Sequence, residues 1–208
     1  VRVSGRGLRR VTRGPALDQW PTWSPDGSRL AFVRGKDAGA ELYVVGAGGK
    51  GLRRLTRNHV EDATPSWSPD GRLIVFASKR ARTGPFSLLV IPAAGGVASR
   101  VGGVRGGEPA WSPDGTRIAF ARAAPGVTVE TTNVYVMNAD GSGVRQLTHE
   151  RRGTVSHHPS WSADGKSIVF MSNRAGTSRG ASLWVVSAST GGMRRLTTSV
   201  YEDVDPDW

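Results

Sequence analysis

Apolar and polar residues follow one pattern that recurs four times along the chain. Seven and nine residues after a recurring Trp stand two apolar residues: Leu30/Phe32, Ile74/Phe76, Ile118/Phe120 and Ile168/Phe170. This alternation places both side chains on one face of a β-strand. A short apolar run then predicts a further strand in each copy, at residues 42–45, 88–91, 134–137 and 183–186. The pattern therefore predicts an all-β chain.

Each copy opens with a turn signal. Trp-Ser-Pro-Asp-Gly occupies residues 23–27, 67–71 and 111–115, and Trp-Ser-Ala-Asp-Gly occupies 161–165. Pro fixes φ at the second position of such a turn, and Gly accepts the positive φ that closes it. The Trp residues are 44, 44 and 50 positions apart. This period suits a repeat of four strands, in which a first strand ends at the Trp.

The fourth strand of each repeat is basic, as in Leu52-Arg53-Arg54-Leu55-Thr56. Arg on an edge strand discourages pairing with other chains, so we expect these strands at the outer rim of four-stranded antiparallel β-propeller blades. The chain is predicted to be one propeller segment, 1–208, with four complete blades near 20–56, 64–101, 108–148 and 158–197. Residues 7–12 would be the fourth strand of a preceding blade, and 205–208 the first strand of a following blade.

The large apolar side chains of interior blades should be nearly fully buried, because neighbouring blades cover them on both faces. We expect this for Trp67, Phe76, Trp111, Phe120 and Phe170, with Trp23 and Trp208 more exposed. The first and last strands belong to different blades and lack the two strands between them. We therefore expect an open arc, a segment of a larger propeller, whose ends do not pair.

These motifs resemble a known family. Pro-x-Trp-Ser-Pro-Asp-Gly, then Ile-Ala-Phe, Leu-Tyr-Val-Val and Arg-Arg-Leu-Thr are similar to the WD40-like β-propeller repeat of the TolB family, over nearly the whole chain. The resemblance implies a six-bladed type of propeller in a periplasmic or extracytoplasmic location. It also implies a non-catalytic scaffold, without cofactor, that binds a protein or peptide partner. The alternative is an accessory or sensor propeller of a larger protein, such as a prolyl-oligopeptidase-like serine peptidase or a membrane receptor.

Composition adds few constraints. The formal charge of +11 raises nucleic acid as a partner, but only four of the 28 basic residues are Lys, which is typical of a compositional bias. Because aromatic residues are not interleaved beside Arg9, Arg53 and Arg194, we expect a solvated basic rim without specific nucleic-acid binding. No apolar run approaches 18 residues, so no membrane insertion is expected. The absence of Cys excludes disulfides and thiolate chemistry.

The connectors between a fourth strand and the next Trp hold nine of the 17 acidic residues, all four His and only five basic residues. In a propeller these connectors run from the rim to the central channel on one face, where such proteins commonly bind ligands. The loops between second and third strands lie on the same face and are basic: Lys36, Lys79, Arg80, Arg82, Arg122, Arg174 and Arg179. The sequence predicts an acidic channel mouth inside a basic collar.

Seven connector residues are candidate binding residues. Asp18, Asp62 and Asp203 each precede a Trp by five positions, and a repeated Asp in a tight connector also has a structural interpretation, as an acceptor for nearby backbone N–H groups. Glu108, His157, His158 and Asp205 differ between repeats and stand just before Pro, so no shared structural role explains them. They are the better candidates for contact with a partner.

Catalytic and metal sites are not predicted. Gly176-Thr177-Ser178-Arg179-Gly180 matches a nucleophile elbow, but a strand follows it and no His lies downstream of Ser178. His59, His157 and His158 could bind a metal ion, as in some sugar-lyase propellers. However, adjacent His side chains on extended backbone point in opposite directions, which disfavours two ligands from one pair.

Overall fold

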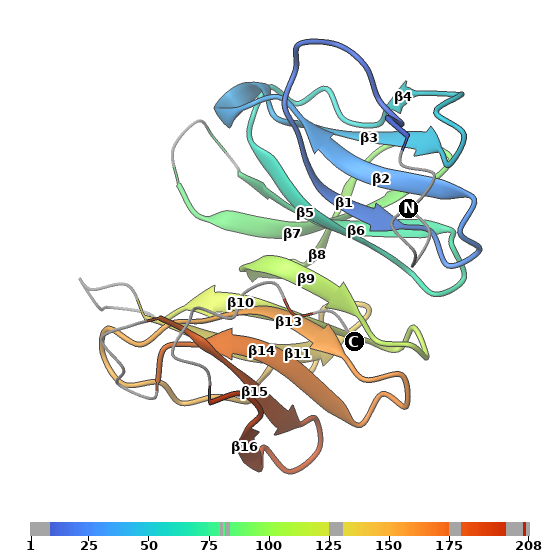
Figure 1. The fold of residues 1–208 in the computed structure, drawn as a ribbon. Helices are drawn as coiled ribbons and strands as arrows, with labels where there is room; N and C mark the ends of the chain where they lie inside the picture. Colours follow the sequence, from blue (N-terminus) through green and yellow to red (C-terminus); the bar gives the residue numbers. More distant parts are fainter. Residues whose placement is uncertain are drawn as a thin grey trace.

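The computed structural model describes residues 9–79, 81, 84–124, 131–174, 180–198 and 206, and shows four separate four-stranded antiparallel sheets, blades 1 to 4. Figure 1 shows their order along the chain. The strands are β1 (Asp18–Trp23), β2 (Arg29–Arg34), β3 (Glu41–Gly46) and β4 (Arg53–Arg54) in blade 1; β5 (Asp62–Trp67), β6 (Leu73–Lys79), β7 (Phe86–Pro92) and β8 (Ser99–Arg105) in blade 2; β9 (Gly107–Trp111), β10 (Arg117–Ala123), β11 (Thr132–Asn138) and β12 (Arg145–Gln146) in blade 3; and β13 (Ser156–Trp161), β14 (Ser167–Ser172), β15 (Ser182–Ser187) and β16 (Met193–Arg195) in blade 4.

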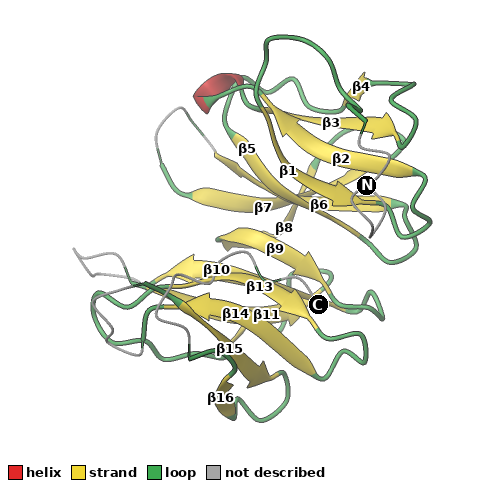
Figure 2. Ribbon diagram, in the orientation of Figure 1, coloured by secondary structure: helices red, strands yellow, loops and turns green. Residues whose placement is uncertain are grey.

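The prediction of an all-β fold is confirmed. Each first strand ends at the expected Trp, and strands follow one another in space in chain order. Within the described ranges the only helix is a single 3-10 turn, Asp37–Gly39 (Figure 2). No helix of this described part is long and apolar enough to cross a membrane.

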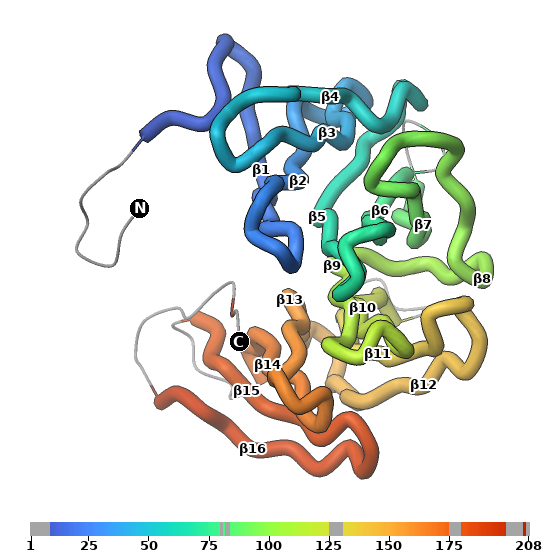
Figure 3. Tube along the Cα trace, turned by 90° about the vertical axis from the view of Figure 1, so that its right-hand side faces the viewer, coloured from blue at the N-terminus to red at the C-terminus, as the bar shows by residue number. Residues whose placement is uncertain are grey.

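The four blades form an arc that is open on one side (Figure 3). Extensive strand contacts between sheets join only blades that are neighbours in the chain, and no ladder joins the first and last described strands. Residues 9–12 are not in a strand, contrary to expectation, because no described strand pairs with them. Arg9 nevertheless donates a hydrogen bond to the carbonyl of Ala47. Apart from Pro206, the strand expected at 205–208 lies outside the described residues.

The Ser-Pro-Asp-Gly turns fold alike in all four blades. In blade 1 the Ser24 hydroxyl donates to Asp26 Oδ1 at 2.6 Å and accepts the Arg29 N–H at 2.9 Å, while Asp26 accepts the Ser28 N–H at 3.0 Å. Gly27 has φ +66°, which glycine adopts without a steric penalty. The blade 4 turn keeps this network with Ala163 in place of Pro, so the network itself defines the turn.

The core consists of three apolar layers, each between adjacent blades. Phe76, Phe120 and Phe170 are fully buried, as predicted. Trp67 is 6% exposed, whereas the equivalent Trp23, on the outer face of blade 1, is 56% exposed. Trp208 lies outside the described residues. Each layer needs two blades, so no blade buries its apolar face alone.

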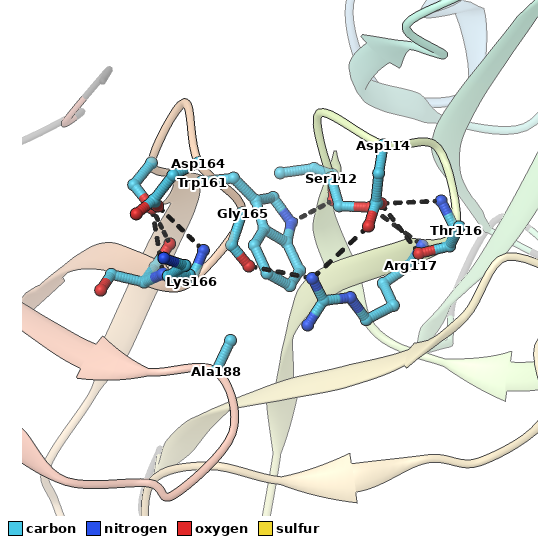
Figure 4. Close-up of polar contacts among 12 residues, drawn as sticks. Ser112, Asp114, Thr116, Arg117, Trp161, Asp164, Gly165, Lys166 and Ala188 are labelled. Atoms are coloured by element: carbon cyan, nitrogen blue, oxygen red, sulfur yellow. Dashed lines mark hydrogen bonds and ion pairs between the residues drawn. The ribbon is translucent and has the colours of Figure 1, made fainter.

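The prediction for Trp111 is wrong: this side chain is only partly buried. The guanidinium of Arg117 in blade 3 lies 4.6 Å from the ring centre of Trp161 and donates to Gly165 O at 2.9 Å (Figure 4). Arg29 covers Trp67 in the same way, at 4.8 Å. Leu73 stands at the equivalent position facing Trp111, and it lines a 230 Å³ cavity beside the indole. The shorter side chain leaves part of the indole uncovered.

Basic rim residues also join blades, which the solvated-rim prediction did not include. Arg53 donates to the carbonyls of Ala93, at 2.6 Å, and Ala94 in blade 2. Arg145 of blade 3 donates in the same way to Ala188 of blade 4. These bonds satisfy turn carbonyls of the next blade along the outer rim.

Candidate binding site in the central channel

One backbone position near the channel has the same unusual conformation in every blade. Trp20, Thr64, Glu108 and His158 have φ of 50°, 45°, 54° and 53°, and each precedes a Pro. L-residues seldom adopt this left-handed region, β-branched Thr least of all, and a following Pro normally favours extended backbone. The ladder between first and second strands shifts register at each of these sites. The fold therefore maintains four strained residues at one level of the channel.

These residues surround a common cavity of 470 Å³. Its lining comes from Pro206 and from the four inner strands: Trp20, Pro21, Thr22, Thr64, Pro65, Ser66, Glu108, Pro109, Ala110, His158, Pro159 and Ser160. Proline rings recur around the wall, while the residue before each Pro supplies a different chemical group per blade: an indole, a hydroxyl, a carboxylate and an imidazole. The backbone is thus repeated, and the chemistry that it presents is not.

Three of the predicted residues lie together. Glu108 Oε1 is 3.2 Å from His157 Nδ1 and 3.9 Å from His158 Nε2, and Glu108 Oε2 accepts the backbone N–H of His158 at 2.7 Å. Burial raises the pKa of Glu108, but the hydrogen bond and charge of His157 and the charge and N–H of His158 together hold it below its usual value. Glu108 is therefore an ionised carboxylate fixed between two blades.

The other nitrogen of His157 also has a partner. His157 Nε2 is 3.2 Å from Thr132 Oγ1. The order hydroxyl, imidazole, carboxylate is that of an acyl-transfer relay. Thr132 is buried, however, and its hydroxyl already accepts the Ser156 N–H at 3.0 Å. In this arrangement the network orients His157 and does not expose a nucleophile. Ser178 lies outside the described residues.

Asp18 and Asp62 are engaged within their own blades. Asp18 accepts two bonds from Arg34, at 2.6 and 2.9 Å, and the Arg34 hydrogen bonds hold the pKa of Asp18 below its usual value, against desolvation. Asp62 is fully buried, which raises its pKa, and accepts bonds from Ser78 and Asn58. Their partners are side chains, not the backbone groups that we expected. Asp203 and Asp205 lie outside the described residues.

The prediction of an acidic mouth inside a basic collar did not include ion pairs between the two groups. Two connector acids pair with collar bases, Glu61 with Lys79 at 2.5 Å and Glu150 with Arg174 at 2.9 Å, and Asp18 pairs with the β2 residue Arg34. Counting charges along the chain missed this compensation, because it depends on contacts across the sheet. Within the described ranges, no group of three or more His, Cys, Asp or Glu side chains is arranged to bind a metal ion.

The positive φ of the residue before Pro was also missed by the sequence analysis. A residue before Pro is ordinarily extended, so sequence alone favours the opposite conformation. The recurring Pro two positions before the Trp was the available signal, since a repeated Pro marks a repeated backbone constraint.

Comparison with known proteins agrees with this architecture. The chain is 38% identical over 76 residues to the Tol-Pal system protein TolB of Rhizorhabdus wittichii, and this match covers 36% of the chain and 16% of that protein. It is 34% identical over 79 residues to the uncharacterized peptidase YuxL of Bacillus subtilis, covering 38% of the chain and 11% of that protein. The chain thus corresponds to a small part of either relative.

Solved structures show the same fold. The putative TolB of Agrobacterium tumefaciens superposes with a TM-score of 0.70 at 21% identity, covering 93% of this chain and 85% of that one. The family model described as the TolB beta propeller domain matches residues 3–107 and again residues 101–208. Together these two matches span nearly the whole sequence, and the chain belongs to the TolB beta propeller domain family.

Proposed function

We propose that this chain is a non-catalytic propeller domain that binds a protein or peptide segment at the connector face, in an extracytoplasmic compartment. The observation that carries the proposal is the ring of four strained residues before Pro around the 470 Å³ cavity. Strained backbone persists only where the surrounding structure enforces it, and it is concentrated at binding sites. A cavity of this size, with an apolar wall and a few polar groups, suits a few residues of a partner segment.

The partner would insert apolar side chains against Trp20 and the proline rings, and donate hydrogen bonds to Glu108. Trp20 is well exposed and Glu108 is held ionised by its two His neighbours. An indole and a fixed carboxylate favour a segment with a cationic or N–H-rich group next to apolar side chains.

A library of short displayed peptides, selected on the purified chain, tests this proposal. Selected peptides should lose about tenfold or more in affinity for the Trp20→Ala and Glu108→Gln variants, because hot spots combine aromatic burial with charged hydrogen bonds. Val97→Ser is the matched control, since Val97 is 89% exposed in the β7–β8 turn. Peptides that bind all three variants equally would contradict a channel site.

The accessory-domain alternative is favoured by the similarity to YuxL, of which this chain matches 11%. In that case the full-length gene would encode a hydrolase domain beside the propeller. Assay of the full-length protein against peptide substrates separates the two proposals. A propeller-only protein should show no hydrolysis, and the His157→Ala variant should not alter this result.

A further inference from the structure

The four blades can be compared at one pair of facing residues, at the far ends of the first and second strands. In blade 1 this pair is Asp18 and Arg34. The guanidinium makes two bonds to the carboxylate, at 2.6 and 2.9 Å, and lies 5.4 and 5.5 Å from the ring centres of Phe32 and Tyr43. The guanidinium thus lies against both rings, and the carboxylate occupies its hydrogen-bonding edge.

Blade 3 has the same arginine without the carboxylate. The facing positions are Gly106 and Arg122, one step beyond the paired residues Gly107 and Ala121. Phe120 and Tyr135 stack as Phe32 and Tyr43 do, and the Arg122 guanidinium lies 5.7 Å from the Tyr135 ring centre. A Cβ on Gly106 would lie 2.6 Å from Phe120 Cδ2 and 2.8 Å from Ala121 O. Packing therefore prevents position 106 from supplying an acid.

A pocket of 520 Å³ opens where the missing carboxylate would lie. Arg122 and Arg105 line it together with apolar side chains that include Phe86, Ala121 and Ala123. Within the part of the chain that the structure describes, no carboxylate lies within ion-pair distance of Arg122. Glu108 borders the pocket but is bonded to His157 and to the His158 N–H. The pocket thus combines an apolar wall with two cations, one of which lies over an aromatic ring.

We propose that this pocket binds the carboxylate of an exogenous ligand with an apolar body, and that Arg122 receives it as Arg34 receives Asp18. Such a carboxylate belongs to a small free acid or to the C-terminus of a peptide. Phe86 and the alanine side chains would contact the apolar body, and Arg105 would add a second positive charge. Glu108 lines both cavities, but Trp20, Thr64 and His158 do not line this pocket, so the inference is tested separately from the channel proposal.

Titration calorimetry with two pairs of probes tests the chemistry and separates the sources. The first pair is 3-phenylpropanoate and its primary amide; the second is N-acetyl-Ala-Phe with a free or an amidated C-terminus. We expect each acid to bind about tenfold or more tightly than its amide, because the amide cannot form the bidentate charged pair. If only 3-phenylpropanoate binds, the ligand is a small free acid. If N-acetyl-Ala-Phe with a free C-terminus binds as well, the pocket accepts the C-terminus of a peptide.

Three variants locate the site. Arg122→Gln should abolish the preference for acid over amide. Ala123→Phe should lower the affinity for both acids, because the larger side chain fills the pocket while Arg122 stays in place. Arg34→Gln is the matched control. It should change neither the preference for acid over amide nor the affinity for the acids, since Arg34 is already paired with Asp18. Thermal unfolding of each variant establishes that it is folded, and Trp20→Ala should bind the acids normally.

A second measurement uses blade 1. Asp18→Gly leaves Arg34 without its carboxylate, as Arg122 is in blade 3, so acetate should raise the melting temperature of this variant more than that of the Asp18→Gly/Arg34→Gln double variant. The proposal fails if neither acid binds at millimolar concentration, if acid and amide bind equally, if Arg122→Gln retains the preference, or if inorganic phosphate binds as well as the acids.

Discussion

The junction between blades 2 and 3 differs from the junctions on either side of it. Two arginines cross the junction between blades 1 and 2, and two cross the junction between blades 3 and 4. At each junction an inner arginine, Arg29 or Arg117, covers the Trp of the next blade. An outer arginine, Arg53 or Arg145, donates hydrogen bonds to turn carbonyls of the next blade. Between blades 2 and 3, Leu73 and Ser99 stand at the two Arg positions. The middle junction therefore contains neither arginine contact.

At this middle junction two glycine backbones meet instead. A Cβ on Gly102 of β8 would lie 2.6 Å from Gly141 O, and one on Gly141 would lie 2.5 Å from Gly102 N. The two backbones are in direct contact, and in Figure 1 the chain passes from the upper two blades to the lower two between β8 and β9. The two family matches also overlap there, at residues 101–107. Arginine contacts thus accompany the apolar layer at two of the three junctions, and a close contact between two glycine backbones accompanies it at the third.

The largest effect should come from enlarging Gly102. Gly102→Ala should lower the free energy of unfolding by about 3 kcal/mol, because the new methyl group has no space against the Gly141 backbone and φ is +55°. Urea denaturation measures it. Gly103→Ala, with φ +68° but no atom within 4 Å of the new Cβ, should cost only about 1–2 kcal/mol. Equal losses would mean that the close approach of the two glycines contributes nothing.

Removal of an inner arginine should have a smaller effect. Arg117→Ala loses the contact with Trp161 and the bond to Gly165 O, and should cost about 1–2 kcal/mol. Trp161 should become more accessible to acrylamide quenching. If the Arg117→Ala variant is as stable as the parent, the contacts of Arg117 do not stabilise the packing of blade 3 against blade 4.

The converse substitution should transfer this contact to the middle junction. Leu73→Arg should cover Trp111 and raise the free energy of unfolding by up to about 1 kcal/mol, with the Trp111 emission shifted to shorter wavelength. Blade 1 shows that the fold accepts Arg at this position. Destabilisation would indicate that the cavity beside Trp111 cannot hold the guanidinium.

Acid should have the smallest effect per residue, and it should act at the Ser-x-Asp-Gly turn of each blade. The Ser112 hydroxyl and the Thr116 N–H lower the pKa of Asp114 from 3.8 to about 2. Because the folded value is depressed, this stabilisation is complete above pH 3.8 and is lost as the pH falls toward 2. The stability difference between the parent and Asp114→Asn should be below about 1 kcal/mol at neutral pH, since solvent screens this exposed turn, and should vanish near pH 2. A stability difference that stays the same from neutral pH to pH 2 would contradict the lowered pKa of Asp114.

Several features could be predicted because their causes are local. The alternation from Leu30 to Phe32 and the turn at Pro25 and Gly27 each involve residues a few positions apart, and these defined the strands. The choice of Glu108, His157 and His158 came from their variation between repeats, and the structure brings these three together. Their role in binding remains a prediction.

Other features could not be predicted from the sequence. Trp111 carries the same motif as Trp67, yet its burial depends on Leu73 in the preceding blade. The acidic mouth was inferred from charges along the chain, but Glu61 and Glu150 lie beside Lys79 and Arg174 in the folded sheets. In both cases the deciding partner belongs to another strand or another blade.

The repeated blade could be inferred from the sequence alone, because strand alternation and turn conformation depend on short-range sterics. The differences between the four copies arise from tertiary packing. It imposes a left-handed conformation before four prolines, since the inner strands must bend at the channel, and it leaves Arg122 without the carboxylate that Arg34 receives from Asp18. Those outcomes depend on packing between strands and blades, which a repeat motif read along the chain does not contain.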